Sequence, residues 1–193
     1  MLSNIIRKRG FYKYRLLGHY VNILADKGLD VLGSRNIDLS SGVLLGKNVL
    51  LDAKSYGNGH IVIGINSEIH DYSRLMCYGG EISIGENCTV NPFCVLYGHG
   101  GLKIGNNTHI ATHCVIIPAN HKFDQADKLI SAQGETREGI TIGDDVWIGA
   151  NCVILDGVSI GNGSVIGAGS VVTRNIPSMS VTAGVPAQVI RTR

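Results

Sequence analysis

The sequence predicts an all-β fold in which short strands and turns wind into a repeated coil. In the last third of the chain, an apolar residue recurs every six positions: Ile142, Ile148, Ile154, Ile160, Ile166 and Val172. An amphipathic helix would repeat its apolar residues at steps of three and four, and a half-buried strand at steps of two. A step of six fits a short strand followed by a turn. Short repeats of fixed period are typical of solenoids, in which each unit buries its apolar face against its neighbours.

The same period runs through the earlier part of the chain. Its apolar members there are Leu39, Leu45, Leu51, Ile63, Ile69, Leu75, Ile84, Val90, Leu96, Ile104, Ile110 and Ile116. If three repeats close one triangular coil, successive coils lie about 4.8 Å apart. We therefore expect residues 31–177 to form seven or so coils. Breaks in the register after Leu75 and Leu96 predict loops that bulge from corners of the coil.

The remaining positions of the repeat predict tight corners. The fifth position is nearly always small: Ser67, Ser73, Cys88, Cys94, Thr108, Cys114, Cys152, Ser164 and Ser170. A small residue suits a corner that faces a narrow core, while the large aliphatic residue at the first position fills that core. Asn and Gly are frequent at the third and fourth positions, as at Asn107 and Gly163, and they favour a left-handed backbone in a turn.

Composition narrows the class of protein. Four of the five cysteines occupy the small fifth position, so we expect core residues and neither metal ligands nor disulfides. Their odd number favours a reducing compartment, and hence a cytoplasmic location. The 17 basic and 15 acidic residues give a net charge of +2, which favours neither a nucleic-acid nor a membrane partner. No apolar run reaches the ~18 residues of a transmembrane segment, and no secretory signal is expected.

Residues 1–30 lie outside the repeat. Their apolar residues recur at helical spacing, with basic residues between them: Ile5, Ile6, Tyr12, Leu16, Leu17, Tyr20, Val21 and Leu24. We expect a short helical segment that caps the open end of the coils, where strand edges would otherwise be exposed. The alternative is a basic amphipathic helix over residues 1–27 that contacts anionic lipid.

The six-residue period stops between Ile116 and Ile142, which predicts a long loop over residues 118–141. Loops of this length are usually functional or disordered. His121 lies where the loop leaves the rigid coil, a place where catalytic groups are often held. Of the other histidines, His109 and His113 are expected to point outward.

The chain resembles the hexapeptide-repeat acyltransferases, in the branch of the maltose, galactoside, polysaccharide and xenobiotic O-acetyltransferases. The resemblance rests on the segments DVWIGA and GAGSVVT, on AGVPAQVIR ending at Arg191, and on the NHKFD loop around His121. It implies a left-handed parallel β-helix and a homotrimer, with residues 178–193 as a tail that packs on the helix and the coenzyme site. The handedness comes from the resemblance alone, because the general crossover rule favours the right hand.

The resemblance also implies an acetyl-CoA-dependent O-acetyltransferase that acts on a sugar hydroxyl. His121 would be the general base, since histidine titrates near neutral pH and can take a hydroxyl proton. Asn91 would hold the acceptor hydroxyl, and Trp147 of a neighbouring subunit would line the acceptor site.

The same resemblance implies contacts to the acyl donor, acetyl-CoA. Ala150 and Ala168 are small residues past which the pantetheine arm would run, and the Ala150 N–H is a candidate oxyanion donor. Thr173, Arg174 and Arg191 would lie near the nucleotide end, where arginine can bind phosphate oxygens.

Two positions depart from the family pattern. His99 stands where the galactoside branch carries an acidic residue that lines the acceptor pocket, and Gln188 replaces a basic coenzyme contact. The segment before Ile63 looks more like members of cell-surface polysaccharide pathways. We therefore expect a sugar hydroxyl of a glycan or its precursor as the acceptor.

Several alternatives stay open from the sequence. N-acetylation of an amino sugar nucleotide, or acetylation of a xenobiotic, would use the same base. A γ-type carbonic anhydrase would place three histidines around zinc, but the spacing of His99, His109 and His113 lacks its His-x4-His pair, and we expect no metal. A non-catalytic scaffold built from the repeat is the remaining alternative.

Overall fold

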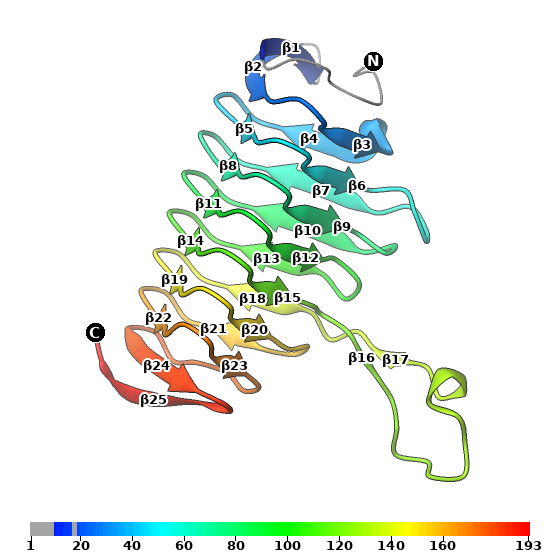
Figure 1. Cartoon of the computed structure of the whole chain (residues 1–193), viewed down its shortest axis with the longest axis vertical. Coiled ribbons are helices and arrows are strands. Elements are labelled where there is room, and N and C mark those ends of the chain that lie inside the picture. Colours follow the sequence, from blue (N-terminus) through cyan, green and yellow to red (C-terminus); the bar gives the residue numbers. More distant parts are fainter. Residues whose placement is uncertain (1–9, 17–18) are drawn as a thin grey trace.

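The computed structural model describes residues 10–16 and 19–193, which form a parallel β-helix of stacked triangular coils (Figure 1). Three sheets, here called A, B and C, make the three faces of the prism. Sheet B contains one strand from each of seven coils. Its strands are β3 (Asp30–Leu32), β6 (Leu50–Asp52), β9 (Arg74–Met76), β12 (Val95–Tyr97), β15 (Val115–Ile116), β20 (Val153–Ile154) and β23 (Val171–Val172).

The chain passes from sheet B to sheet C and then to sheet A before it starts the next coil. Sheet C consists of β4 (Ile37–Leu39), β7 (His60–Ile63), β10 (Glu81–Ile84), β13 (Leu102–Ile104), β18 (Ile140–Ile142) and β21 (Ser159–Ile160). In the coils, sheet A consists of β5 (Leu44–Leu45), β8 (Glu68–Ile69), β11 (Thr89–Val90), β14 (His109–Ile110), β19 (Trp147–Ile148), β22 (Val165–Ile166) and β24 (Ser180–Gly184). Two short 3-10 helices are η1 (Ser34–Asn36) and η2 (Ile130–Ala132).

Three edges join the sheets. The A–B edge comprises residues 46–49, 70–73, 91–94, 111–114, 149–152 and 167–170. The B–C edge comprises residues 53–59, 77–80, 98–101, 117–139, 155–158 and 173–175. The C–A edge comprises residues 40–43, 64–67, 85–88, 105–108, 143–146, 161–164 and 177–179.

The core is built from the first position of the repeat, as predicted. Every predicted first-position residue from Leu39 to Val172 is at most 2% exposed. These aliphatic side chains stack coil upon coil inside the prism, which removes them from water over its whole length.

The small fifth-position residues are buried as well, and they bond one coil to the next. The Ser67 hydroxyl donates to the Gly85 carbonyl at 2.8 Å, and the Cys88 thiol donates to the Gly105 carbonyl at 3.0 Å. All five cysteines are free, buried thiols. The expectation that four of them are core residues at corners is confirmed.

The fourth position of the repeat carries the left-handed backbone that the turns require. Asn66 and Asn107 have φ angles of 55° and 56°, as expected for a residue that tolerates this region. Tyr72 and Phe93 adopt the same conformation at the A–B edge, with φ of 62° and 64°. The corner geometry thus imposes this conformation even on bulky side chains.

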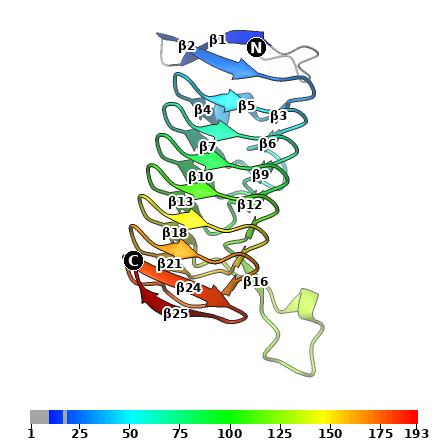
Figure 2. The same ribbon diagram turned by 60° about the vertical axis from the view of Figure 1, so that its left-hand side comes forward.

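The predicted N-terminal helix is wrong where the structure describes that segment. Residues Gly10–Leu16 and His19–Ala25 are strands β1 and β2, which pair in antiparallel fashion, and β2 pairs with β5 to extend sheet A. Figure 2 shows this hairpin across one end of the coils. The cap is a hairpin because the edge of sheet A offers unpaired backbone groups to it. Residues 1–9 and 17–18 of that prediction lie outside the described residues.

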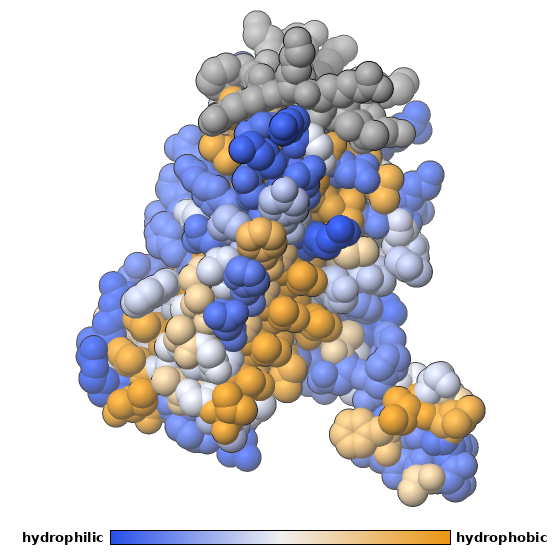
Figure 3. All heavy atoms as spheres, in the orientation of Figure 1, coloured by the Kyte–Doolittle hydropathy of each residue, from blue (hydrophilic) through white to orange (hydrophobic). Residues whose placement is uncertain are grey.

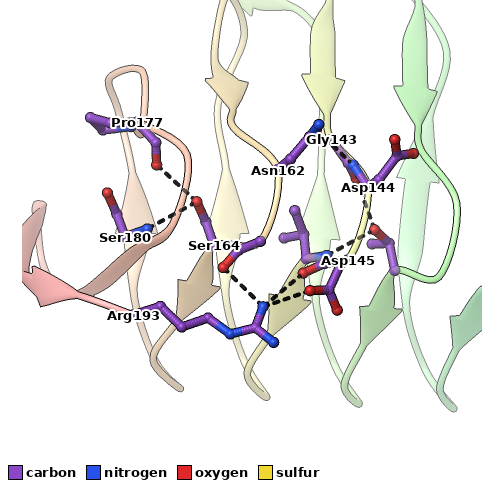
Figure 4. A network of polar contacts seen from close by, with 11 residues as sticks. Gly143, Asp144, Asp145, Asn162, Ser164, Pro177, Ser180 and Arg193 are labelled. Atoms are coloured by element: carbon purple, nitrogen blue, oxygen red, sulfur yellow. Dashed lines mark hydrogen bonds and ion pairs between the residues drawn. The ribbon is translucent and has the colours of Figure 1, made fainter.

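The C-terminal residues close the other end of sheet A. β24 pairs with β22, and β25 (Ala187–Thr192) turns back antiparallel to β24. The Arg193 guanidinium then reaches the C–A edge, where it contacts the Asp145 carboxylate at 2.8 Å and the Gly163 carbonyl at 3.0 Å (Figure 4). The tail therefore packs on the β-helix as part of its last coils.

Among residues 10–16 and 19–193, no helix has the length and apolar character needed to cross a membrane.

Candidate active site

The extruded loop leaves the B–C edge with His121 at its base. β16 (Asn120–His121) pairs with β17 (Glu135–Thr136) in antiparallel fashion, so that His121 lies opposite Glu135. Nδ1 of His121 is 4.0 Å from Oε1 of Glu135, and the imidazole is 63% exposed. The second carboxylate oxygen of Glu135 binds Arg137 at 3.1 Å. The histidine is therefore accessible to a ligand while its other side faces a carboxylate.

Asp156 fixes the strand on which the loop returns. Its carboxylate accepts hydrogen bonds from the Thr136 hydroxyl at 2.7 Å and from the Gly139 N–H at 2.9 Å. It also accepts the Glu138 N–H at 3.1 Å. These bonds tie the loop base to the next coil and hold the His121–Glu135 pair on a rigid support.

His99 lies on the same edge, one coil before the loop. Its ring stacks on Tyr78 with a centroid separation of 4.4 Å. Burial lowers the pKa of His99, and the nearby Arg137 guanidinium lowers it further, against the opposing charges of Glu135 and Asp156. The neutral imidazole is therefore favoured, and its buried Nδ1 has no hydrogen-bond partner among the described residues.

The predicted acceptor residue Asn91 lies on the A–B edge, across sheet B from His121. Its side-chain amide donates to the Ile110 carbonyl at 3.0 Å, which fixes the side chain along the coil. Ala150 and Ala168 lie on the same edge in the following coils. A single chain therefore separates the predicted site residues into two groups, one on each edge of sheet B.

The backbone at Ala150 and Ala168 is open to a ligand. Gly149 N–H and Asn151 N–H donate to main-chain carbonyls at 2.8 and 3.0 Å, but the Ala150 N–H donates to no acceptor in the described part of the chain. On the C–A edge, the equivalent Asp144 N–H donates to Oδ1 of Asn162 at 3.0 Å (Figure 4). On the A–B edge, the next coil offers only the methyl group of Ala168. The Ala150 N–H is thus an available fixed donor of the kind that stabilises an oxyanion.

The other predicted contacts lie near the C-terminal coils. Trp147 stands on β19 between His109 and Val165 and is 56% exposed, so it is not a packed corner residue. Thr173 and Arg174 are exposed on the B–C edge of the last coil. Arg191 and Gln188 are exposed on β25, and Arg191 donates to the Thr192 carbonyl at 2.9 Å. Trp147, Gln188 and Arg191 thus lie on sheet A, whereas Thr173 and Arg174 share the B–C edge with His121, two coils further along the chain.

The outward face of sheet B, between the two groups, is apolar. Val95, Val115, Val153 and Val171 lie side by side in register on β12, β15, β20 and β23. Figure 3 shows hydrophobic residues as a band along this part of the molecule. The outward residues of sheet C in register are polar, as in the series Ser83, Lys103 and Thr141. The outward face of sheet B is therefore more apolar than that of sheet C, which favours its burial.

A single chain does not group the three histidines that a zinc site of the carbonic anhydrase type would need. His99 lies on the B–C edge, His109 on sheet A and His113 on the A–B edge. His109 and His113 are exposed, as predicted. Within the part of the chain that the structure describes, no three His, Cys, Asp or Glu residues are grouped to hold a metal ion.

Sequence reasoning missed Glu135, Arg137 and Asp156. The sequence showed only that residues 125–138 are polar, and that signal does not tell which of them faces His121. The pairing of β16 with β17 places Glu135 opposite His121, and the six-residue period does not predict this pairing.

Comparison with known proteins places the chain in a family. The family model of the bacterial transferase hexapeptide (six repeats) matches residues 139–174. WbbJ of Escherichia coli, named for a lipopolysaccharide biosynthesis O-acetyl transferase, is 37% identical over 142 residues, which cover 69% of this chain and 72% of that protein. The chain belongs to the hexapeptide-repeat acyltransferase family.

Other members of the hexapeptide-repeat family agree with this. Galactoside O-acetyltransferase of Escherichia coli is 41% identical over 118 residues, or 59% of this chain and 55% of that one. The solved structure of a maltose O-acetyltransferase from Clostridium difficile is 35% identical and has a TM-score of 0.60, covering 67% of this chain and 68% of that chain. The predicted left-handed parallel β-helix is confirmed. The chain spans about half the length of several curated relatives, with coverage of 50 to 57%.

Proposed function

We propose that this chain is an acetyl-CoA-dependent O-acetyltransferase that acts on a sugar hydroxyl in cell-surface polysaccharide biosynthesis, with His121 as the general base. The observation that carries the proposal is the position of His121, held out from the coils on a rigid loop base with Glu135 beside its Nδ1 at 4.0 Å. The names of the galactoside and lipopolysaccharide relatives support a sugar acceptor.

The reaction assigns one task to each group of residues. A ring nitrogen of His121 takes the proton of the acceptor hydroxyl as the oxygen attacks the thioester carbonyl carbon of acetyl-CoA. The Ala150 N–H stabilises the oxyanion that forms. The C–S bond then breaks, the acetyl group stays on the sugar oxygen, and the thiolate of CoA takes the proton from the imidazolium. Asn91 and His99 would position the acceptor, and Thr173, Arg174 and Arg191 the nucleotide part of CoA.

We infer that the active unit is a homotrimer that turns its B sheets towards a threefold axis. The apolar series Val95, Val115, Val153 and Val171 supports burial of this face. In that arrangement, the A–B edge of each subunit borders the B–C edge of the next. Ala150 and Asn91 of one subunit would then lie opposite His121 of its neighbour, which accounts for their separation in the single chain. Trp147 would likewise contact the acceptor across a subunit interface, in the site of the neighbouring subunit.

The free, buried thiols support a reducing compartment, and we place the protein in the cytoplasm, where acetyl-CoA is available.

The decisive test is an acceptor screen with acetyl-CoA, in which release of the CoA thiol is measured with sugars, glycans, amino sugar nucleotides and antibiotics. We expect transfer to a sugar hydroxyl, and a kcat about 10²–10⁴-fold lower in His121→Ala. His60→Ala is the matched control, because His60 also faces a carboxylate, Asp38 at 2.8 Å, but lies on sheet C.

Activity only with an amino sugar nucleotide would replace O-acetylation by N-acetylation, and activity only with an antibiotic would indicate a xenobiotic enzyme. Full activity of His121→Ala would exclude the assigned base. If CoA does not change the melting temperature of the protein, the acyltransferase is excluded and the non-catalytic scaffold is the remaining alternative.

A further inference from the structure

Three tyrosines at or beside the B–C edge have no task in the proposed reaction. Tyr56 stacks on Tyr78 with centroids 4.9 Å apart and an angle of 20° between the rings, and Tyr78 stacks on His99 at 4.4 Å and 12°. Tyr97 tilts against Tyr78 at 4.6 Å. We call Tyr56, Tyr78 and Tyr97 the tyrosine stack. Its members come from three successive coils, so the stack runs parallel to the axis of the β-helix.

The tyrosine stack is held on the surface and not in the core. Tyr56 is 77% exposed, so its ring gains little from burial. Tyr56 and Tyr78 also have φ angles of 62° and 49°, a region that bulky side chains disfavour. Backbone preference therefore explains tyrosine at neither position, and burial does not explain it at Tyr56; Tyr78 is half-buried.

The stack leads to the candidate active site. His99, its last neighbour, interacts electrostatically with Arg137 and Glu135 at the loop base. The residue after it, Gly100, donates its N–H to the Pro118 carbonyl at 3.0 Å, where the extruded loop begins. A ligand that extends from His121 towards the N-terminal coils along this edge would meet the tyrosine stack.

The exposed groups of the tyrosine stack are complementary to those of a carbohydrate. Among the described residues Tyr56 stacks only on Tyr78 and is 77% exposed, so the stack ends in an open ring face, which suits the C–H groups of a sugar, while the phenolic hydroxyls suit its O–H groups. A hydrogen bond with Tyr97 and burial raise the pKa of Tyr78 to about 12, so its hydroxyl stays protonated and able to donate.

We propose that the tyrosine stack is a carbohydrate subsite that binds sugar residues adjoining the one that is acetylated, so that the acceptor is an oligosaccharide or a longer glycan. The proposal rests on the proposed function, which supplies the sugar residue that is acetylated. It adds the length of the acceptor and the residues that recognise it.

The test measures binding of the full-length protein to defined glycans of one to six sugar residues, built from hexoses, deoxyhexoses and N-acetylhexosamines. Tyr56→Asn removes the ring but keeps a residue that tolerates the left-handed backbone, as Asn48 and Asn66 do in this chain. Ile65→Ala is the control, because Ile65 is 42% exposed on the C–A edge, away from both edges of sheet B.

We expect the wild type to bind glycans of three or more residues more tightly than the monosaccharide. Tyr56→Asn should lower the affinity for the longer glycans by about two- to tenfold and leave monosaccharide affinity unchanged. Tyr97→Phe keeps the ring and loses one hydroxyl. It should also lower the affinity for the longer glycans and not for the monosaccharide, but by a smaller factor. Binding of no glycan, or equal affinities of wild type and Tyr56→Asn, would overturn the subsite.

Incubation of each bound glycan with acetyl-CoA separates this proposal from the proposed function. Glycan binding that depends on Tyr56, but without release of CoA, would contradict acetyl transfer and keep the carbohydrate subsite. Acetyl transfer with the same kcat/KM for short and long glycans in wild type and Tyr56→Asn would contradict the subsite and keep the transferase.

Discussion

Nδ1 of His121 lies 4.0 Å from Oε1 of Glu135, its partner across the antiparallel pair β16–β17. The other oxygen of the same carboxylate is held by Arg137 at 3.1 Å. In the proposed reaction, Glu135 would orient the imidazole and stabilise the positive charge that develops on it during proton transfer. This role resembles that of the carboxylate in a nucleophile–histidine–carboxylate arrangement.

Replacement of this carboxylate should slow the chemical step. Glu135→Gln keeps the shape of the side chain and removes its charge, so we expect kcat to fall by about tenfold or more while KM for acetyl-CoA is unchanged. Steady-state kinetics with the best acceptor measure both values. Glu68→Gln is the control, because Glu68 contacts His70 at 3.0 Å on sheet A. An unchanged kcat in Glu135→Gln would remove Glu135 from the mechanism.

A charge on the outward face of sheet B should break the proposed trimer. Val115→Arg places a guanidinium in the middle of the apolar series, where its desolvation on assembly is unfavourable. We expect the molar mass in solution to fall from three times 20.6 kDa to 20.6 kDa, with loss of acetyl transfer. Light scattering after size exclusion measures the mass. Ser83→Arg on sheet C should leave it unchanged, and a wild-type monomer would contradict the trimer.

The buried hydroxyls at the corners should contribute to stability. Ser67 donates to the Gly85 carbonyl at 2.8 Å and accepts the Cys88 N–H at 2.9 Å. Ser67→Ala leaves both buried groups without this partner, so we expect the free energy of unfolding to fall by about 1–3 kcal/mol. Urea denaturation measures it. Ser159→Ala, at an exposed site on sheet C, should change stability by less than about 0.5 kcal/mol.

The buried thiols should make the protein less stable in alkali. Burial, with the neighbouring Asp52 charge, raises the pKa of Cys77 from 9.0 to about 12. A hydrogen bond with Cys152 lowers the pKa of Cys114, but the contact with Cys94 and burial outweigh it and raise this pKa to about 11. An unfolded chain loses these protons near pH 9, before the folded chain does, so this contribution to stability is complete below pH 9 and is lost as the pH rises towards 11–12. Under reducing conditions, unfolding free energies at pH 8 and pH 10 should differ less in Cys77→Ala than in the wild type.

The coils were predictable because each six-residue unit repeats the same local rule. A buried aliphatic residue such as Ile148, a left-handed corner and a small buried residue such as Cys152 all follow from that rule. The N-terminal hairpin was not predictable by the helical spacing, because the open edge of sheet A decides its structure. At the end of β2, Ile23 and Ala25 are buried while Asn22 is exposed, which is the alternation of a strand and not the spacing of a helix.

The candidate site was predictable only in part. His121 stood out because it begins the single long interruption of the repeat. Glu135 did not, because its position opposite His121 depends on how the two ends of the loop pair. The division of Asn91 and His121 between two edges of sheet B is also a property of the closed coil, and no linear spacing in the sequence contains it.

The Ala150 N–H donates to no acceptor among the described residues. On the C–A edge, Oδ1 of Asn162 accepts the Asp144 N–H at 3.0 Å, and Asp144 in turn accepts the Asn106 N–H at 2.6 Å. The A–B edge has no such acceptor below Ala150, because the residue in the next coil is Ala168. Ala168→Asn should recreate the bond of the C–A edge on the A–B edge.

We expect Ala168→Asn to satisfy the Ala150 N–H within the chain, and so to remove the donor that the oxyanion needs. The kcat should then fall by about 10²–10³-fold, the usual effect of losing one oxyanion donor, while thermal stability is equal to that of the wild type or higher. Asn162→Ala is the matched control, since it deletes the same kind of bond on the C–A edge and should lower stability without lowering kcat. Loss of stability together with activity in Ala168→Asn would show a steric defect, and unchanged kcat would show that the Ala150 N–H does not contact the reacting oxygen.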